Sequence, residues 1–264
     1  VEFEFNGREV SGRTSETLIE IAKREGVEIP HLCYKAGMEA VGNCRSCMVE
    51  IKGERVLAPS CCRAPAAGME VTSNSERAVR SQKMVVELLA SDVPERVYKL
   101  DSELDTWKRK LGIGKPRFPA REQPAADLSH PAMAVNLDAC IQCTRCVRAC
   151  REAQVNDVIG YAHRCAHSAI VFALDDPMGE SSCVACGECV QACPTGALMP
   201  SVMLDENQTR VTYADRKVDS LCPFCGVGCQ VTYQVKDEKV IYAEGRDGPA
   251  NHNRLCVKGR FGFD

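Results

Sequence analysis

The sequence predicts an α+β protein built from several small domains, and three observations lead to this prediction. The chain of 264 residues contains 18 cysteines but only 5% aromatic residues, which is little for one large hydrophobic core. The cysteines fall into four tight groups that have the spacing of metal ligands. Alternating segments typical of strands and periodic segments typical of helices both occur along the chain.

An N-terminal domain at 1–78 is predicted to be a small sheet packed on one helix. Apolar residues alternate with glutamates before the turn pair Asn6-Gly7, so a hairpin is expected there. A helix follows, with a capping box formed by Thr17 and Glu20. Further strands are expected at 48–51, 56–58 and 69–72.

Four cysteines of this domain have the spacing of a two-iron site, with intervals of ten, two and thirteen residues: Cys33, Cys44, Cys47 and Cys61. The domain resembles the β-grasp, plant-type [2Fe–2S] domain that begins the large iron–sulfur subunit of respiratory NADH dehydrogenase. The resemblance implies that these four thiolates hold one [2Fe–2S] cluster. It also selects Cys61 over Cys62, because the family has Ser-Cys-x-x-Pro there and Ser60-Cys61 matches the Ser-Cys pair, with Pro65 one residue further on than in the family pattern. Cys62 is then expected to be a small, buried apolar residue.

Residues 79–129 are predicted to form a helical linker without a cluster. Two helices are expected over 76–112, broken near 92–94, and an extended strap is expected at 114–124. The apolar stripe of the first helix is predicted to consist of Met84, Val85, Leu88 and Leu89. The linker holds neither cysteine nor histidine, whereas the resembling family usually carries a further cluster there on one His and three Cys.

A cysteine motif of the form CxxCxxCxxxC occurs twice, at 140–150 and at 183–193, each after a predicted short strand (133–137 and 170–174). This run is typical of bacterial iron–sulfur ferredoxins, in which three thiolates surround one cubane and the fourth ligates the other cluster. We therefore predict two [4Fe–4S] clusters with crossed ligands in a ferredoxin-like domain at 130–204. The first cluster is assigned to Cys140, Cys143, Cys146 and Cys193, and the second to Cys183, Cys186, Cys189 and Cys150. Zinc is the alternative, although zinc knuckles use two CxxC pairs and leave no cysteine over.

The string His163-Arg164-Cys165-Ala166-His167 lies between the two motifs. It could bind a metal ion, because histidine and cysteine are both metal ligands. However, it lacks a fourth ligand nearby, and the two cubanes already have eight thiolates. A loop or core role is therefore expected for Cys165, His163 and His167.

The fourth cysteine group lies in a small β-rich domain predicted at 205–264. Cys222, Cys225 and Cys229 form CxxCxxxC, and Cys256 follows after 26 residues. The insert is expected to be a hairpin of 230–235 and 239–243. The four thiolates are assigned to a third [4Fe–4S] cluster, and the nearby glycines let backbone amides approach its sulfurs.

This end resembles the cluster domain of molybdenum or tungsten bis-pterin oxidoreductases, and residues 254–264 look most like formate dehydrogenases. In that family, the lysine after the fourth cysteine assists electron passage between cluster and pterin. Lys258 is the matching residue and is therefore the implied electron relay. The alternative is an ordinary surface lysine.

Composition and missing motifs argue against other activities. The net charge of −3 disfavours general nucleic-acid binding, and the basic run at 107–110 is expected to be a solvated helix face. No apolar run approaches the roughly 20 residues of a membrane span, so no membrane partner is expected. There is no GxSxG, Walker loop or GxGxxG, hence no visible hydrolytic nucleophile or nucleotide cradle. The clustered cysteines indicate a reducing compartment, and a cytoplasmic location is expected.

Four clusters in one chain indicate a path for electron transfer, and no catalytic residue is expected in this stretch. The resemblances imply the electron-transfer portion of the catalytic subunit of an NAD-linked formate dehydrogenase. Formate would be oxidised at a Mo- or W-bis-pterin guanine dinucleotide in the remainder of that subunit, and electrons would pass to a flavin- and NAD-binding diaphorase subunit. The alternatives are an electron-transfer subunit of a bidirectional hydrogenase or NADH dehydrogenase, and a zinc-stabilised interaction module without a redox role.

Overall fold

The computed structural model describes residues 1–93, 98–99, 102–204 and 214–263. The chain divides into two compact units, which are described separately. The first comprises Val1–Asp92 and Glu103–Ala120, and the second comprises Val93–Ser102 and Arg121–Asp264. Short helices and small sheets occur in both, as the α+β prediction requires. The predicted domain boundaries stay a prediction, and residue 205 lies outside the described residues.

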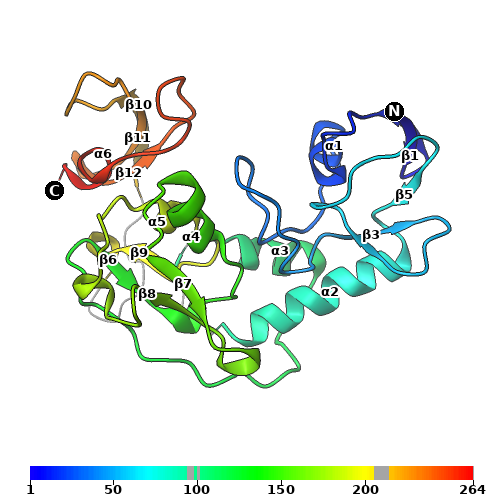
Figure 1. Cartoon of the computed structure of the whole chain (residues 1–264), viewed down its shortest axis with the longest axis horizontal. Helices are drawn as coiled ribbons and strands as arrows, with labels where there is room; N and C mark the ends of the chain where they lie inside the picture. The colour runs from blue at the N-terminus through cyan, green and yellow to red at the C-terminus, as the bar shows by residue number, and fades with distance from the viewer. Residues whose placement is uncertain (94–97, 100–101, 205–213, 264) are drawn as a thin grey trace. The chain divides into compact units, whose positions relative to one another are not determined.

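The first unit contains a five-stranded sheet with the strand order β2-β1-β5-β3-β4. Figure 1 labels three of its strands, β1, β3 and β5. Its strands are β1 (Glu2–Phe5), β2 (Arg8–Ser11), β3 (Met48–Ile51), β4 (Ala58–Pro59) and β5 (Glu70–Thr72). β1 pairs antiparallel with β2 and parallel with β5. The alternation along β1 buries Phe3 and Phe5 and exposes the glutamates between them. β4 begins two residues later than the predicted strand at 56–58.

Helix α1 (Leu18–Arg24) packs its apolar face against this sheet. The predicted capping box is present: the backbone N–H of Thr17 donates to Oε2 of Glu20 over 2.7 Å. Gly26, with φ at 71°, follows the end of the helix, where a left-handed residue is favoured. Leu18 and Ile21 are fully buried, so the helix is fixed to the core by its first turn.

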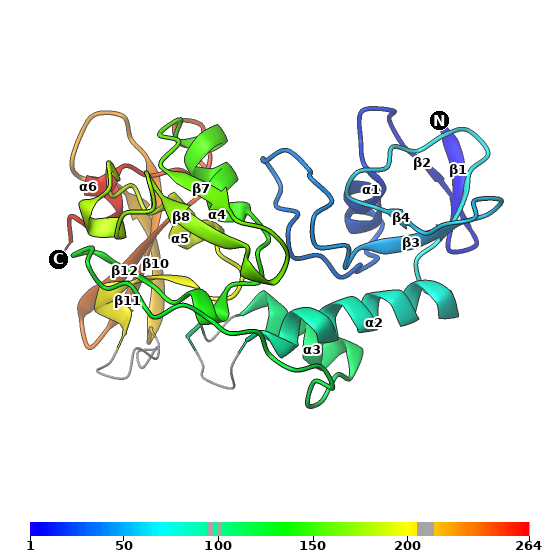
Figure 2. The same ribbon diagram turned by 60° about the horizontal axis from the view of Figure 1, so that its bottom comes forward.

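Helices α2 (Glu76–Ser91) and α3 (Glu103–Leu111) confirm the two predicted helices, although residue 94 of the expected break lies outside the described residues. α2 lies along β3, and α3 lies against α2 (Figure 2). The predicted apolar stripe of α2 was wrong, because Leu88 is 48% exposed. The buried face instead consists of Ala78, Gln82, Val86, Glu87 and Ala90. Small side chains on this face allow close approach to the sheet, and the Gln82 amide donates to the carbonyl oxygens of Met48 (2.8 Å) and Ser73 (3.1 Å).

The second unit begins with a ferredoxin-like part that has two pairs of short antiparallel strands. The strands are β6 (Met133–Val135) with β9 (Leu198–Pro200), and β7 (Ile159–Ala162) with β8 (Ala169–Phe172). β6 and β8 were predicted, but their partners were not. The cysteine motifs contain helices α4 (Arg145–Arg148) and α5 (Glu188–Ala192), and a π-helical turn at Ala149–Ala153 follows α4. Short 3₁₀ turns occur at Leu137–Ala139, Cys165–His167, Met178–Glu180 and Ser201–Met203.

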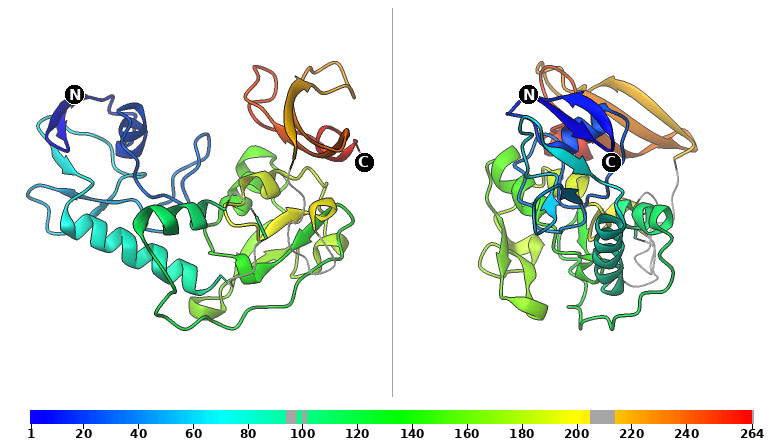
Figure 3. Two further views of the ribbon diagram at one scale, coloured as in Figure 1. Left: turned by 180° about the vertical axis from the view of Figure 1, so that it is seen from behind. Right: turned by 90° about the vertical axis from the view of Figure 1, so that its right-hand side faces the viewer.

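The C-terminal part of this unit is an antiparallel sheet, β10-β11-β12, with one short helix beside it (Figure 3). The elements are β10 (Arg216–Leu221), β11 (Gln230–Lys236), β12 (Lys239–Gly245) and α6 (Val257–Phe261). The predicted hairpin is confirmed as β11 and β12, whose turn places Asp237 and Glu238 at positive φ. Strand β10 was not anticipated. In the described part of the chain, no helix has both the length and the apolar character of a membrane span.

Gln82 provides a test of how α2 is attached to the sheet. Replacing Gln82 with Met should lower the free energy of unfolding by about 1–3 kcal/mol, because two backbone carbonyls lose their amide donor. Lys83→Met is the matched control, since Lys83 lies next to it on the exposed side of α2. Chemical denaturation of both variants measures the difference. Equal stability of the two variants would contradict the attachment by Gln82.

Candidate iron–sulfur centres

The first cysteine group gathers around the loop that precedes β3. Cys33 lies after α1, Cys44 and Cys47 lie in the loop, and Cys61 lies two residues after the end of β4. The backbone N–H of Cys33 lies 3.3 Å from Sγ of Cys44, and that of Cys44 lies 3.4 Å from Sγ of Cys33. Arg45, which follows Cys44, adopts φ of 58°, which turns the backbone around the sulfurs. The structure thus brings together the four cysteines predicted for the [2Fe–2S] cluster, and their assignment as ligands stays a prediction.

The protonation of these four thiols is strongly uneven. Hydrogen bonds from the Cys44 and Cys61 thiols lower the pKa of Cys33 to about 2. A hydrogen bond from Cys61 likewise lowers the pKa of Cys47 to about 7. The donors show the opposite shift: hydrogen bonding to Cys33 raises the pKa of both Cys44 and Cys61. Four thiolates at this distance cannot coexist without a cation, so the donor set fits bound iron.

Cys62 was expected to be buried, and the structure corrects this expectation. Its side chain is exposed, whereas that of Cys61 is fully buried. Both residues lie in the turn after β4, and of the two only Cys61 packs into the core of the first unit. The Cys62 sulfur nevertheless lies 3.5 Å from that of Cys61.

The two ferredoxin-type motifs have the same backbone conformation. The residue before the second cysteine is left-handed in both, with φ of 56° at Gln142 and 54° at Ala185. The residue after the second cysteine is also left-handed, with φ of 59° at Thr144 and 71° at Gly187. The N–H of Gln142 lies 3.4 Å from Sγ of Cys140, and the N–H of Ala185 lies 3.4 Å from Sγ of Cys183. Such N–H groups stabilise charge on cluster sulfurs.

The fourth cysteine of each motif lies beside the first three cysteines of the other. One cavity of about 20 Å³ is lined by all four thiols predicted for the first cluster: Cys140, Cys143, Cys146 and Cys193. Burial raises the pKa of Cys143 to about 12, and the charge of Cys193 adds to the rise. Burial also raises the pKa of Cys189, and the charges of Cys186, Cys183 and Cys150 add to it. These neighbours support the crossed assignment, which stays a proposal.

The C-terminal group lies between the end of β10 and the start of α6. Burial raises the pKa of Cys229, and the charges of Cys222, Cys225 and Cys256 contribute. A Cβ atom at Gly259 would lie only 3.5 Å from Sγ of Cys222, so the helix backbone runs close to this sulfur. Lys258, the predicted relay, is exposed on α6. Its relay role stays a prediction.

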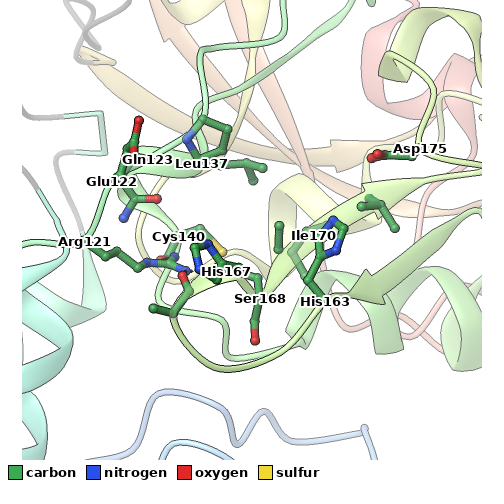
Figure 4. Close-up of a pocket in the computed structure, with 14 residues that line it drawn as sticks. Arg121, Glu122, Gln123, Leu137, Cys140, His163, His167, Ser168, Ile170 and Asp175 are labelled. Atoms are coloured by element: carbon green, nitrogen blue, oxygen red, sulfur yellow. Dashed lines mark hydrogen bonds between the residues drawn. The ribbon is translucent and has the colours of Figure 1, made fainter.

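The HxCxH string forms an exposed loop rather than part of the core. His163 and His167 line a cavity of about 550 Å³ next to Cys140 (Figure 4). Arg121 holds this loop by donating to the carbonyl oxygens of Ala166 and Ser168, and it also reaches that of Cys140. Among the described residues, this string is not part of any group of three His, Cys, Asp or Glu side chains that could hold a single metal ion.

Sequence reasoning did not anticipate several basic residues that surround the cysteine groups. Besides Arg121, Lys99 donates from Nζ to the carbonyl oxygen of Cys193 over 2.9 Å. Arg260 is completely buried and donates to the carbonyl oxygen of Cys186. Arg260 directly follows the Cys-x-Lys-Gly string in the sequence, which was the one signal that could have indicated it.

Comparison with known families gives a consistent result for three segments. Residues 1–76 match the 2Fe-2S iron-sulfur cluster binding domain, and residues 130–199 match the ferredoxin-like domain of NADH-quinone oxidoreductase subunit 3. Residues 215–264 match the molybdopterin oxidoreductase Fe4S4 domain. Together with the four thiol groups, these matches define an electron-transferring iron–sulfur protein with [2Fe–2S] and [4Fe–4S] binding domains.

Curated relatives and a solved structure indicate which kinds of oxidoreductase the chain resembles. The chain is 32% identical to an NADH-quinone oxidoreductase subunit of Rhizobium meliloti, over 94% of this chain and 29% of the relative. It is 29% identical to the NADPH-Fe(3+) oxidoreductase subunit alpha of Geobacter sulfurreducens (100% and 31%) and 26% identical to a formate dehydrogenase-like protein of Staphylococcus haemolyticus (94% and 29%). The crystal structure of an NAD+-reducing [NiFe]-hydrogenase in the H2-reduced state matches with a TM-score of 0.70 and 27% identity, over 76% of this chain and 87% of that one.

The chain is the N-terminal iron–sulfur region of a subunit of the NADH-quinone oxidoreductase and formate dehydrogenase type. It spans about 30% of the length of the curated relatives described above. The relatives from Rhizobium meliloti and Geobacter sulfurreducens are named as subunits of oxidoreductases.

The crossed ligation can be tested with four single variants. Cys193→Ala and Cys140→Ala should remove the same electron paramagnetic resonance (EPR) signal, because both belong to the first predicted cluster. Cys150→Ala and Cys183→Ala should both remove the other signal. Each variant should lose about four irons per chain. If Cys193→Ala instead matched Cys183→Ala, each motif would hold its own cluster and the crossed assignment would be wrong.

The choice between the vicinal cysteines is tested in the same way. Cys61→Ala should abolish the [2Fe–2S] signal and lower the iron content by about two per chain. Cys62→Ala is the matched control and should leave both unchanged, because its side chain is exposed. Iron analysis and EPR of the two variants decide the assignment, and the reverse pattern would make Cys62 the ligand.

Proposed function

We propose that this chain carries electrons between a formate-oxidising Mo- or W-bis-pterin site in the remainder of its subunit and a flavin- and NAD-binding diaphorase subunit. The observation that carries the proposal is the C-terminal cysteine group with its Cys-x-Lys-Gly end, joined to a ferredoxin-like part and a β-grasp part in one chain. The match of 215–264 to a molybdopterin oxidoreductase domain supports it. The formate dehydrogenase-like relatives support the choice of formate.

In this proposal, the residues of the chain hold, insulate and tune the redox centres. One [2Fe–2S] and three [4Fe–4S] clusters supply one-electron steps when bound to the four thiol groups. The N–H groups aimed at Cys33, Cys140 and Cys183 stabilise negative charge on the sulfurs and so favour the reduced state. Five of the eight cysteines of the two ferredoxin-type motifs are buried, which limits the access of water to the path: Cys143, Cys146, Cys150, Cys189 and Cys193. Lys258 is assigned to electron passage between the last cluster and the pterin.

The second candidate is an electron-transfer subunit of an NADH dehydrogenase or of an NAD-reducing hydrogenase. The relative from Rhizobium meliloti and the hydrogenase structure favour it. The sequence of 79–129, which lacks the His and Cys residues of a further cluster, disfavours both of these subunits. The Cys-x-Lys-Gly end disfavours the hydrogenase subunit. A cytoplasmic location belongs to the proposal in either case.

The proposal is tested in the full-length subunit, assembled with its partners. Deletion of 1–78 should abolish formate-dependent NAD reduction and leave dye-coupled formate oxidation, because only electron transfer from the chain to the diaphorase subunit is lost. Cys33→Ala is the matched point variant, since it removes the [2Fe–2S] cluster and keeps the domain. Equal loss of both activities in the point variant would contradict the proposed path. A colourless, zinc-loaded wild-type chain would support the zinc-stabilised module instead.

A further inference from the structure

Arg260, at the end of α6, is the most completely buried charged residue of the described chain. Its side chain has 0% exposure. It donates from Nε to the carbonyl oxygen of Cys186 over 2.7 Å and from Nη1 to Oε1 of Gln191 over 2.7 Å. Its Nη2 forms an ion pair with Glu188, whose side chain is 7% exposed. All three partners belong to the second ferredoxin-type motif, about 70 residues earlier in the chain.

The polar groups around Arg260 extend this contact to the neighbouring backbone. Glu188 also accepts from the backbone N–H of Leu255 over 3.0 Å. Gln191 accepts from the N–H of Gly245 over 3.1 Å and donates to the carbonyl oxygen of Asn253 over 3.2 Å. A buried guanidinium is tolerated only when it is paired and hydrogen-bonded. Here every nitrogen of the guanidinium has a partner. The same two side chains, Glu188 and Gln191, also bind the backbone at the end of β12 and in the segment just before α6.

The second motif has a space for Arg260 that the first motif does not have. A Cβ atom at Gly187 would lie 2.0 Å from Cδ of Arg260. Gly187 has φ of 71°, yet Thr144 occupies the same position of the first motif with φ of 59°. The backbone conformation therefore accepts a side chain at this position, and the Arg260 side chain is what requires glycine in the second motif.

Arg260 also links two ligand groups through hydrogen bonds. Its backbone N–H donates to the carbonyl oxygen of Cys256 over 3.1 Å, and its Nε donates to that of Cys186. Cys256 belongs to the C-terminal thiol group, and Cys186 belongs to the second motif. One residue thus joins a predicted ligand of one cluster to a predicted ligand of the next.

We infer that Arg260 is a positioning residue that docks the C-terminal cluster loop onto the second ferredoxin-type motif and forms the bonded route by which electrons pass between their two clusters. The inference rests on the proposed function for the presence of these clusters. Glu188 and Gln191 accept the hydrogen bonds of the Arg260 guanidinium, and Gly187 leaves space for its side chain. The first ferredoxin-type motif has Thr144 in place of Gly187 and Arg145 in place of Glu188, so it lacks these acceptor and space-providing residues.

The docking is tested by removing the guanidinium from the full-length, cluster-loaded protein. Arg260→Met leaves the Glu188 carboxylate buried without its partner, so the contact should open roughly 100-fold more often. Hydrogen exchange at the amides of Gly245 and Leu255 should speed up by that factor. The magnetic interaction between the two reduced clusters should disappear from the EPR spectrum, with the iron count unchanged. Arg216→Met is the matched control, because Arg216 forms an exposed ion pair with Glu238 in the same domain.

The bonded route is separated from a merely structural role by the conservative variant. Arg260→Lys keeps the charge for Glu188 but cannot serve all three acceptors at once. It should restore slow exchange and the magnetic interaction, while electron transfer between the two clusters, measured by rapid freezing, stays slower than in the wild type. Full recovery of the transfer rate in this variant would limit Arg260 to docking and overturn the route.

Substitution of Gly187 provides an independent test of the docking. Gly187→Thr should reproduce the effects of Arg260→Met, whereas Thr144→Gly at the matching position of the first motif should not. Unchanged exchange and unchanged magnetic interaction in both Arg260→Met and Gly187→Thr would overturn the inference. A wild-type protein without iron would instead refute the proposed function, so the two failures can be told apart.

Discussion

Thiolates cannot share a buried space without a balancing cation, and the structure depends on this constraint. Burial raises the pKa of Cys146 and of Cys189 well above the usual range, and the neighbouring thiolates add to the rise. Ionised sulfur is therefore stable in these groups only where iron takes up its charge. The left-handed residues at Gln142 and Ala185 meet the same need, because they turn backbone N–H groups toward sulfur without adding a further charge.

The same constraint explains how a chain with few aromatic residues forms a core. In the ferredoxin-like part, two cysteines of each motif belong to one buried cluster of side chains with Met133, Phe172 and Leu198, namely Cys146, Cys150, Cys189 and Cys193. The strands around them are only three or four residues long and cannot bury a large surface by themselves. Metal binding and folding are therefore expected to be coupled in this part of the chain, because the ligands are also core residues.

Local spacing could be predicted from the sequence, and contacts between distant segments could not. The intervals within a cysteine motif follow from the size of the group they surround, so the four thiol groups were predictable. Strands β7 and β9 were missed, because short strands are defined by their partners more than by their own pattern. The inward face of α2 was mispredicted because Gln82 turns its amide toward two carbonyls of the sheet. Arg260 was missed because its acceptors lie about 70 residues earlier.

The two ferredoxin-type motifs differ in which arginine balances the negative charge of their thiolates. Arg145 and Glu188 occupy equivalent positions, two residues after the second cysteine of each motif. In the first motif, burial raises the pKa of Cys143 and the charge of Arg145 counteracts this rise. In the second motif, burial raises the pKa of Cys189 and the counteracting charge is that of Arg260. The first motif therefore contains its own buried guanidinium, whereas the second receives one from the C-terminal part. Because docking and charge balance are the same contact in the second motif, its electrostatic environment follows the attachment of the C-terminal part, whereas Arg145 gives the first motif a cation of its own.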